Sequence, residues 1–76
     1  MTPTEYSLLR VLVRNAGKVV THRQILKEVW GPNYGEQTHY LRVYIGRLRE
    51  KLEEDPTRPE VLVTEPGVGY RLLPAA

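Results

Sequence analysis

The hydrophobic pattern changes its period once along this chain, and that change limits the folds open to it. Through residue 53, apolar side chains recur every three or four positions, as on one face of an α-helix. After residue 60 the pattern becomes extended: residues 61–64 and 70–73 are rich in β-formers, and the turn sequence EPGVG separates them. The sequence therefore predicts helices followed by a β-hairpin, an α+β fold in one domain over residues 1–76.

Capping signals divide the helical part into three segments. A first helix is expected to start at Thr2 with a capping box to Glu5 and to end at Ala16-Gly17. A second opens with another capping box at residues 21–24, and Gly31-Pro32 ends it. We expect a loop over residues 31–36 and a third helix from about 37 to 53, with only a stub strand at 18–20. The predicted apolar stripes are Leu8, Leu9, Leu12 and Val13 in the first helix and Ile25, Leu26, Val29 and Trp30 in the second.

Size and composition exclude several kinds of protein. A chain of 76 residues has a thin core and little room for an enclosed active site. It has no cysteine, so disulfides and thiolate metal sites are excluded and a reducing cytoplasm is expected. Its apolar runs are too short for a membrane span, and its start lacks the pattern of a signal peptide.

Charge is distributed unevenly along the chain. Residues 1–52 hold nine Lys or Arg against four Asp or Glu, whereas residues 53–76 hold two against five. A basic excess over two-thirds of the length favours an anionic partner such as nucleic acid. A mixed, solvated surface explains the charge alone equally well.

The third helix carries more arginine, tyrosine and histidine residues than packing against a core requires. Wound at 100° per residue, it places Leu41, Ile45, Leu48 and Leu52 on one stripe, with Tyr44 at its edge. The opposite face has no acidic residue in its first three turns and has Arg47 near its centre. Arginine can pair bidentately with guanine, Val43 could contact a thymine methyl group, and Gly46 would allow close backbone approach. Three helices and a hairpin predict a winged helix-turn-helix with the third helix in the major groove of DNA.

Three stretches resemble the effector domain of OmpR/PhoB-type response regulators: QILKEVWG, LRVYIGRLREKLE and TEPGVGYRL. The resemblance implies a transcription factor activated by phosphorylation of a separate receiver domain. It also implies a head-to-tail dimer on directly repeated half-sites in double-stranded DNA, contact with RNA polymerase, and no cofactor. Within the family, VWGPN, DPTRP and GVGYR are most similar to a regulator of potassium uptake, so potassium-transport genes are the expected targets.

The resemblance also assigns roles to individual residues. The expected base-reading residues are His39, Tyr40, Arg42, Val43 and Arg47. The expected contacts to the DNA backbone are His22, Trp30, Tyr44, Arg49, Thr64 and Tyr70. The wing tip is Pro66-Gly67, where several relatives have an arginine that enters the minor groove. The segment that faces RNA polymerase corresponds to Pro32, Asn33, Tyr34, Gly35 and Glu36.

In the family, a small antiparallel sheet precedes the first helix, and this chain lacks those residues. The chain is therefore expected to be a fragment of a longer receiver–effector protein.

Other functions are weaker interpretations of the same residues. No nucleophile has a base signature nearby and no carboxylate pair converges, so an enzyme is not expected. His22 and His39 lie in different elements, which makes a metal site improbable. The acidic run Glu53-Glu54-Asp55 is expected to be a solvated loop or a subunit contact. A protein-interaction winged helix remains the alternative, although its third helix should be more apolar and poorer in arginine.

Overall fold

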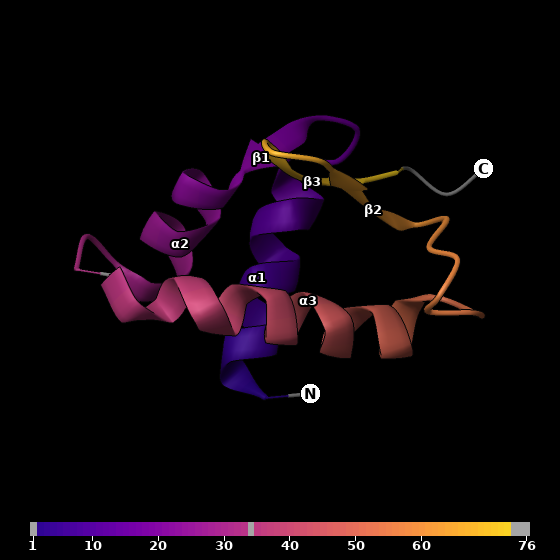
Figure 1. The fold of residues 1–76 in the computed structure, drawn as a ribbon, viewed down its shortest axis with the longest axis horizontal. Coiled ribbons are helices and arrows are strands. Elements are labelled where there is room, and N and C mark those ends of the chain that lie inside the picture. The colour runs from indigo at the N-terminus through magenta and orange to yellow at the C-terminus, as the bar shows by residue number, and fades with distance from the viewer. Residues whose placement is uncertain (1, 34, 74–76) are drawn as a thin grey trace.

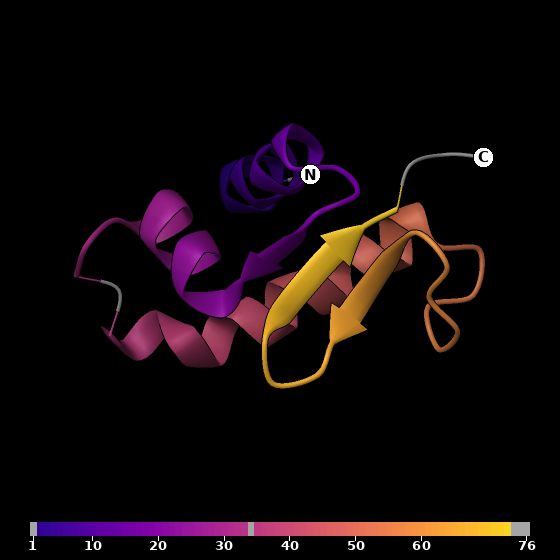
Figure 2. The ribbon, with the colours of Figure 1, turned by 90° about the horizontal axis from the view of Figure 1, so that it is seen from above.

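Three α-helices and a small sheet make up the fold in the computed structural model, which describes residues 2–33 and 35–73 (Figure 1). The helices are α1 (Pro3–Arg14), α2 (His22–Trp30) and α3 (Thr38–Leu52), and the strands are β1 (Val19–Thr21), β2 (Leu62–Glu65) and β3 (Gly69–Leu72). Helix α3 crosses α1, and the sheet lies alongside α3 in both views (Figures 1 and 2). This order confirms the predicted winged helix.

The start of α1 follows the predicted signal in part. Thr2 caps the helix by accepting the Glu5 N–H at 3.2 Å, and Pro3 occupies the first helical position. The Glu5 carboxylate does not close the capping box and is buried instead. It accepts a hydrogen bond from the Thr2 hydroxyl at 3.2 Å and forms an ion pair with Lys51 of α3. The hydrogen bond from Lys51 holds the pKa of Glu5 below its ordinary value.

The buried stripe of α1 differs from the prediction by one position. Leu8 and Leu12 are buried as expected, but Val11 is buried as well and Val13 is 55% exposed. Residues 8, 11 and 12 share a helix face at the i, i+3, i+4 spacing, whereas residue 13 lies about 100° beyond residue 12. The prediction included Val13 because it lies four residues after Leu9, but Leu9 is itself only partly buried at the edge of the stripe, and Val13 faces solvent.

Helix α2 begins and ends where the sequence predicts. The Thr21 hydroxyl accepts the Gln24 N–H at 3.1 Å, and Gly31 ends the helix with a φ of +86°. The next segment was expected to be a loop but includes a short 3-10 helix, η1 (Gly35–Gln37). Because η1 leads directly into α3, that helix starts at Thr38, whose hydroxyl donates to the Gly35 carbonyl at 3.1 Å.

The sheet has three strands rather than the two of a simple hairpin. Its order is β1-β3-β2 and every pairing is antiparallel, so the expected stub strand is paired along its whole length with β3. This pairing requires Gly69, because a Cβ atom there would lie 1.9 Å from the Val20 carbonyl oxygen. Gly67 serves the turn instead: its φ is +74°, and the Val68 N–H closes the turn on the Glu65 carbonyl at 3.0 Å. Pro followed by a positive-φ Gly is the type II pattern.

One core joins all of these elements. Its buried members are Leu8, Val11, Leu12, Val20, Ile25, Leu26, Leu41, Ile45, Leu48, Leu62 and Tyr70. The predicted α3 stripe is confirmed at Leu41, Ile45 and Leu48, while Leu52 is only partly buried. Across residues 2–33 and 35–73, no helix combines the length and apolar character that crossing a membrane needs.

The acidic run after α3 is not wholly solvated, which corrects the expectation for one of its members. Glu54 and Asp55 are exposed, but Glu53 is only 8% exposed. Its carboxylate accepts hydrogen bonds from the backbone N–H groups of Glu60, Val61 and Leu62 at 2.7–3.1 Å. Burial alone would raise the pKa of Glu53. These hydrogen bonds outweigh it and hold the pKa below its ordinary value.

Candidate nucleic-acid interface

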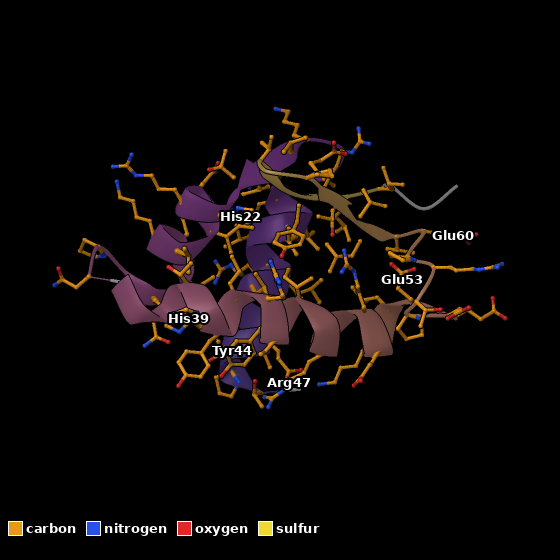
Figure 3. The ribbon with its side chains drawn as sticks, in the orientation of Figure 1. His22, His39, Tyr44, Arg47, Glu53 and Glu60 are labelled. Atoms are coloured by element: carbon orange, nitrogen blue, oxygen red, sulfur yellow. The ribbon has the colours of Figure 1, made fainter. Side chains whose placement is uncertain are left out.

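The outer side of α3 is an exposed row of polar, basic and apolar side chains. It consists of His39, Tyr40, Arg42, Val43 and Arg47, all of them exposed. Two of its members, Tyr40 and Val43, are large hydrophobic side chains, and they are 54% and 50% exposed. His39 and Arg47 lie on the side of α3 that points away from the sheet (Figure 3). The predicted base-reading residues are therefore all accessible on one helix, with Arg42 at the edge that adjoins His22 and Tyr70.

An aromatic group flanks this row on the α2 side. The rings of Trp30 and Tyr44 lie 5.7 Å apart, and the Arg47 guanidinium lies 5.3 Å from the centre of the Tyr44 ring. Both aromatic residues are partly buried against the core, so each is anchored by its ring. A cation over the face of such a ring is attracted by the ring's quadrupole, which favours a defined position for Arg47.

A second group lies where α2, α3 and the sheet meet. The rings of His22 and Tyr70 contact edge to face at 5.2 Å, and the Arg49 guanidinium lies 5.8 Å from the centre of the Tyr70 ring. Beside them is a hollow of about 200 Å³, lined by His22, Thr38, Leu41, Arg42 and Tyr70. Sequence reasoning did not single out Thr38, although its place in the first turn of α3 could have indicated it.

Arg49 is already engaged by the protein itself. Its Nε–H donates to the Leu62 carbonyl at 3.0 Å, and its Nη2 donates to the Thr64 hydroxyl at 2.6 Å. The structure thus brings together three of the predicted backbone contacts, Arg49, Thr64 and Tyr70, although they come from α3, β2 and β3.

The tip of the hairpin is exposed and yet held in place. Pro66 and Gly67 are solvent-exposed at the turn. The carbonyl of the next residue, Val68, accepts the His22 N–H at 3.2 Å, which ties the tip to the start of α2.

The segment expected to face RNA polymerase lies at the far end of the molecule from β2 (Figure 1). Pro32, Asn33 and Gly35 are exposed there. Tyr34 and the side chain of Glu36 lie outside the described part of the chain.

Comparison with known proteins agrees with this geometry. Residues 1–72 match the family described as "Transcriptional regulatory protein, C terminal". The chain is 59% identical over 73 residues to the KDP operon transcriptional regulatory protein KdpE of Escherichia coli. The matched segment is 96% of this chain and 32% of that protein. A KdpE of Mycobacterium tuberculosis is 58% identical over 71 residues, covering 93% of this chain and 31% of that protein. The chain thus spans about a third of the length of these relatives.

A solved structure shares the fold as well. The response regulator DrrB of Thermotoga maritima, an OmpR/PhoB homologue, superposes with a TM-score of 0.86 at 34% identity, over 97% of this chain and 33% of that one. The winged-helix geometry and the match over nearly the whole sequence lead to one assignment. The chain belongs to the family of C-terminal domains of transcriptional regulatory proteins, in the OmpR/PhoB group of response regulators.

Proposed function

We propose that this chain binds double-stranded DNA sequence-specifically, with α3 in the major groove and the β2–β3 wing on the adjacent backbone. The observation that carries the proposal is the exposed row on α3. A major groove about 12 Å wide admits an α-helix and distinguishes all four base pairs, provided that the helix presents hydrogen-bond donors and small apolar groups. The row offers both, with Arg47 as the bidentate donor and Val43 as the apolar contact.

The side chains around the row suit the phosphate backbone. His22 and Tyr70 border the hollow between α2, α3 and the sheet, and their polar groups could approach one phosphate there. On the other flank, the rings of Trp30 and Tyr44 pack against the core. The indole N–H of Trp30 and the hydroxyl of Tyr44 are polar ends that can donate hydrogen bonds to phosphate. Such contacts position a helix without reading sequence.

The electrostatics at the start of α3 support the same partner. No acidic residue lies in the first turn of α3, and no side chain caps its first N–H groups. The positive end of the helix dipole, with no acidic residue in that turn, favours phosphate.

The wider role rests on the relatives. We propose that the chain is the effector domain of a response regulator that controls transcription of potassium-transport genes, as the name of the KdpE relative suggests. Head-to-tail binding to directly repeated half-sites, and contact of the 32–36 segment with RNA polymerase, belong to the same proposal. A Klebsiella pneumoniae RstA DNA-binding domain, solved in complex with its RstA box, is 28% identical with a TM-score of 0.85.

Selection of bound sequences from a random duplex pool tests the proposal directly. We expect enrichment of a short motif that recurs as a direct repeat. If the bound pool stays random, sequence-specific reading is wrong. If the chain retains no duplex at all while capturing protein partners, the protein-interaction alternative replaces it.

A further inference from the structure

One edge of the wing has no neighbouring strand, so its backbone groups would face water unless side chains bind them. In the order β1-β3-β2, strand β2 is at the edge and pairs only with β3. Along an antiparallel strand the backbone groups point alternately toward the two edges. The Val61 carbonyl accepts the Leu73 N–H at 2.7 Å and so points toward the β3 side. The N–H and C=O of Leu62 therefore point toward the free edge.

Side chains of α3 occupy that edge in place of a further strand. The Leu62 N–H donates to Glu53 Oε2 at 2.7 Å, and the Leu62 carbonyl accepts from Arg49 Nε at 3.0 Å. Both backbone polar groups of Leu62 are thus bound by side chains four residues apart, Arg49 in the last turn of α3 and Glu53 at its C-cap.

The attachment extends one residue before Leu62 and two residues after it. Glu53 also accepts the Val61 N–H at 3.0–3.1 Å, and Arg49 also donates to the Thr64 hydroxyl at 2.6 Å. Figure 3 shows Glu53 close to the chain that enters β2. Charged partners make these hydrogen bonds stronger than neutral ones, and the burial of Glu53 limits competition by water.

We propose that Arg49 and Glu53 act as positioning residues that fix the wing relative to the DNA-reading helix, so that α3 and β2 approach DNA as one rigid unit. Arg49 then serves as a strut between helix and wing rather than only as a phosphate contact. This inference rests on the proposed DNA binding, but the attachment itself can be measured without DNA.

The first measurement is amide hydrogen exchange in the free protein. Glu53→Gln removes the charge and presents an NH₂ group to N–H donors, whereas Glu54→Gln makes the same change at the exposed neighbour. We expect the Val61 and Leu62 amides to exchange about tenfold faster in Glu53→Gln, the factor that one hydrogen bond to a charged group contributes. Amides of β3 should stay protected in both variants. Unchanged exchange at Leu62 would overturn the attachment.

The second measurement is binding of the same variants to the selected duplex. We expect Glu53→Gln to weaken binding about tenfold or more while the salt dependence and the preferred sequence stay the same, since Glu53 itself contacts no phosphate. Glu54→Gln should bind like the parent. Faster exchange at Leu62 with unchanged affinity would overturn the positioning role. A parent chain that binds no duplex would instead refute the proposed function and leave the exchange result standing.

Arg49→Lys provides a variant that keeps its charge. Lysine cannot donate to Leu62 and Thr64 in the same fork geometry. If Arg49 is a strut, Arg49→Lys should reproduce the faster exchange at the wing and the weaker binding. If it binds DNA like the parent, Arg49 acts only as a positive charge and the strut is refuted.

Discussion

Replacing Gly46 by alanine should stabilise the fold and damage DNA binding at the same time. Gly46 lies in the middle of α3 without a positive φ, and an added Cβ would meet nothing within 4 Å. Glycine in a helix interior costs about 0.8–1.0 kcal/mol relative to alanine. For a domain of this size, a gain of about 1 kcal/mol corresponds to a rise in Tm of roughly 4–8 °C.

The same methyl group would stand between α3 and the floor of the groove. Gly46 lies on the outer side of the helix beside Val43 and Arg47, where the backbone should approach the bases most closely. A methyl group forced into a packed contact costs about 1–3 kcal/mol. Gly46→Ala should therefore melt at a higher temperature and bind the selected duplex more weakly.

Thermal unfolding and duplex titration of one preparation provide both readings. Ser7→Ala is the matched control, because Ser7 is exposed on α1 and also gains helix propensity on mutation to alanine. It should raise the Tm without changing DNA affinity. Parent-like affinity in Gly46→Ala would show that the backbone does not approach DNA there, and an unchanged Tm would refute the helix-propensity argument.

Three further outcomes follow from the same structure. Gly69→Ala should lower the free energy of unfolding by more than about 2 kcal/mol, since its Cβ would overlap the Val20 carbonyl. Denaturant unfolding measures this, and a midpoint equal to the parent's would show that β1 and β3 separate without cost. Arg47→Ala should cost about 1–3 kcal/mol on the preferred site and relax discrimination at one base pair, whereas equal weakening on all sequences would make Arg47 a phosphate contact. Stability should fall as pH drops below the ordinary glutamate pKa of 4.5 and through the lowered values of Glu5 and Glu53, because the folded state holds both as carboxylates. Melting at stepped pH checks this, and the Glu5→Gln, Glu53→Gln double variant should show a weaker acid dependence than the parent.

Features set by short-range chemistry were predictable from the sequence. The side-chain caps at Thr2 and Thr21, the helix end at Gly31 and the turn at Pro66-Gly67 each depend on residues within a few positions and are present, although Glu5 does not complete its capping box. The buried stripe of α3 followed from helical geometry alone. The exposed residues of α3 were then predictable as well, since residues outside the buried stripe had to face solvent.

Features that depend on distant partners were not predictable in this way. Glu5 and Glu53 looked like ordinary helix-end acids, but Glu5 pairs with Lys51, 46 positions away, and Glu53 binds the backbone entering β2, 7 to 9 positions away. Gly69 was expected to be a turn residue, whereas its role is close approach to β1. The attachment of Arg49 to the wing joins residues 13 and 15 positions apart and has no local signature.

The central claim is that the basic outer surface of α3 binds DNA, and the salt dependence of duplex binding tests it most directly. A domain that neutralises about five phosphates should show log K falling against log salt concentration with a slope near −4.5. We expect a slope close to that value for the selected duplex. A binding constant that does not change with salt would contradict it.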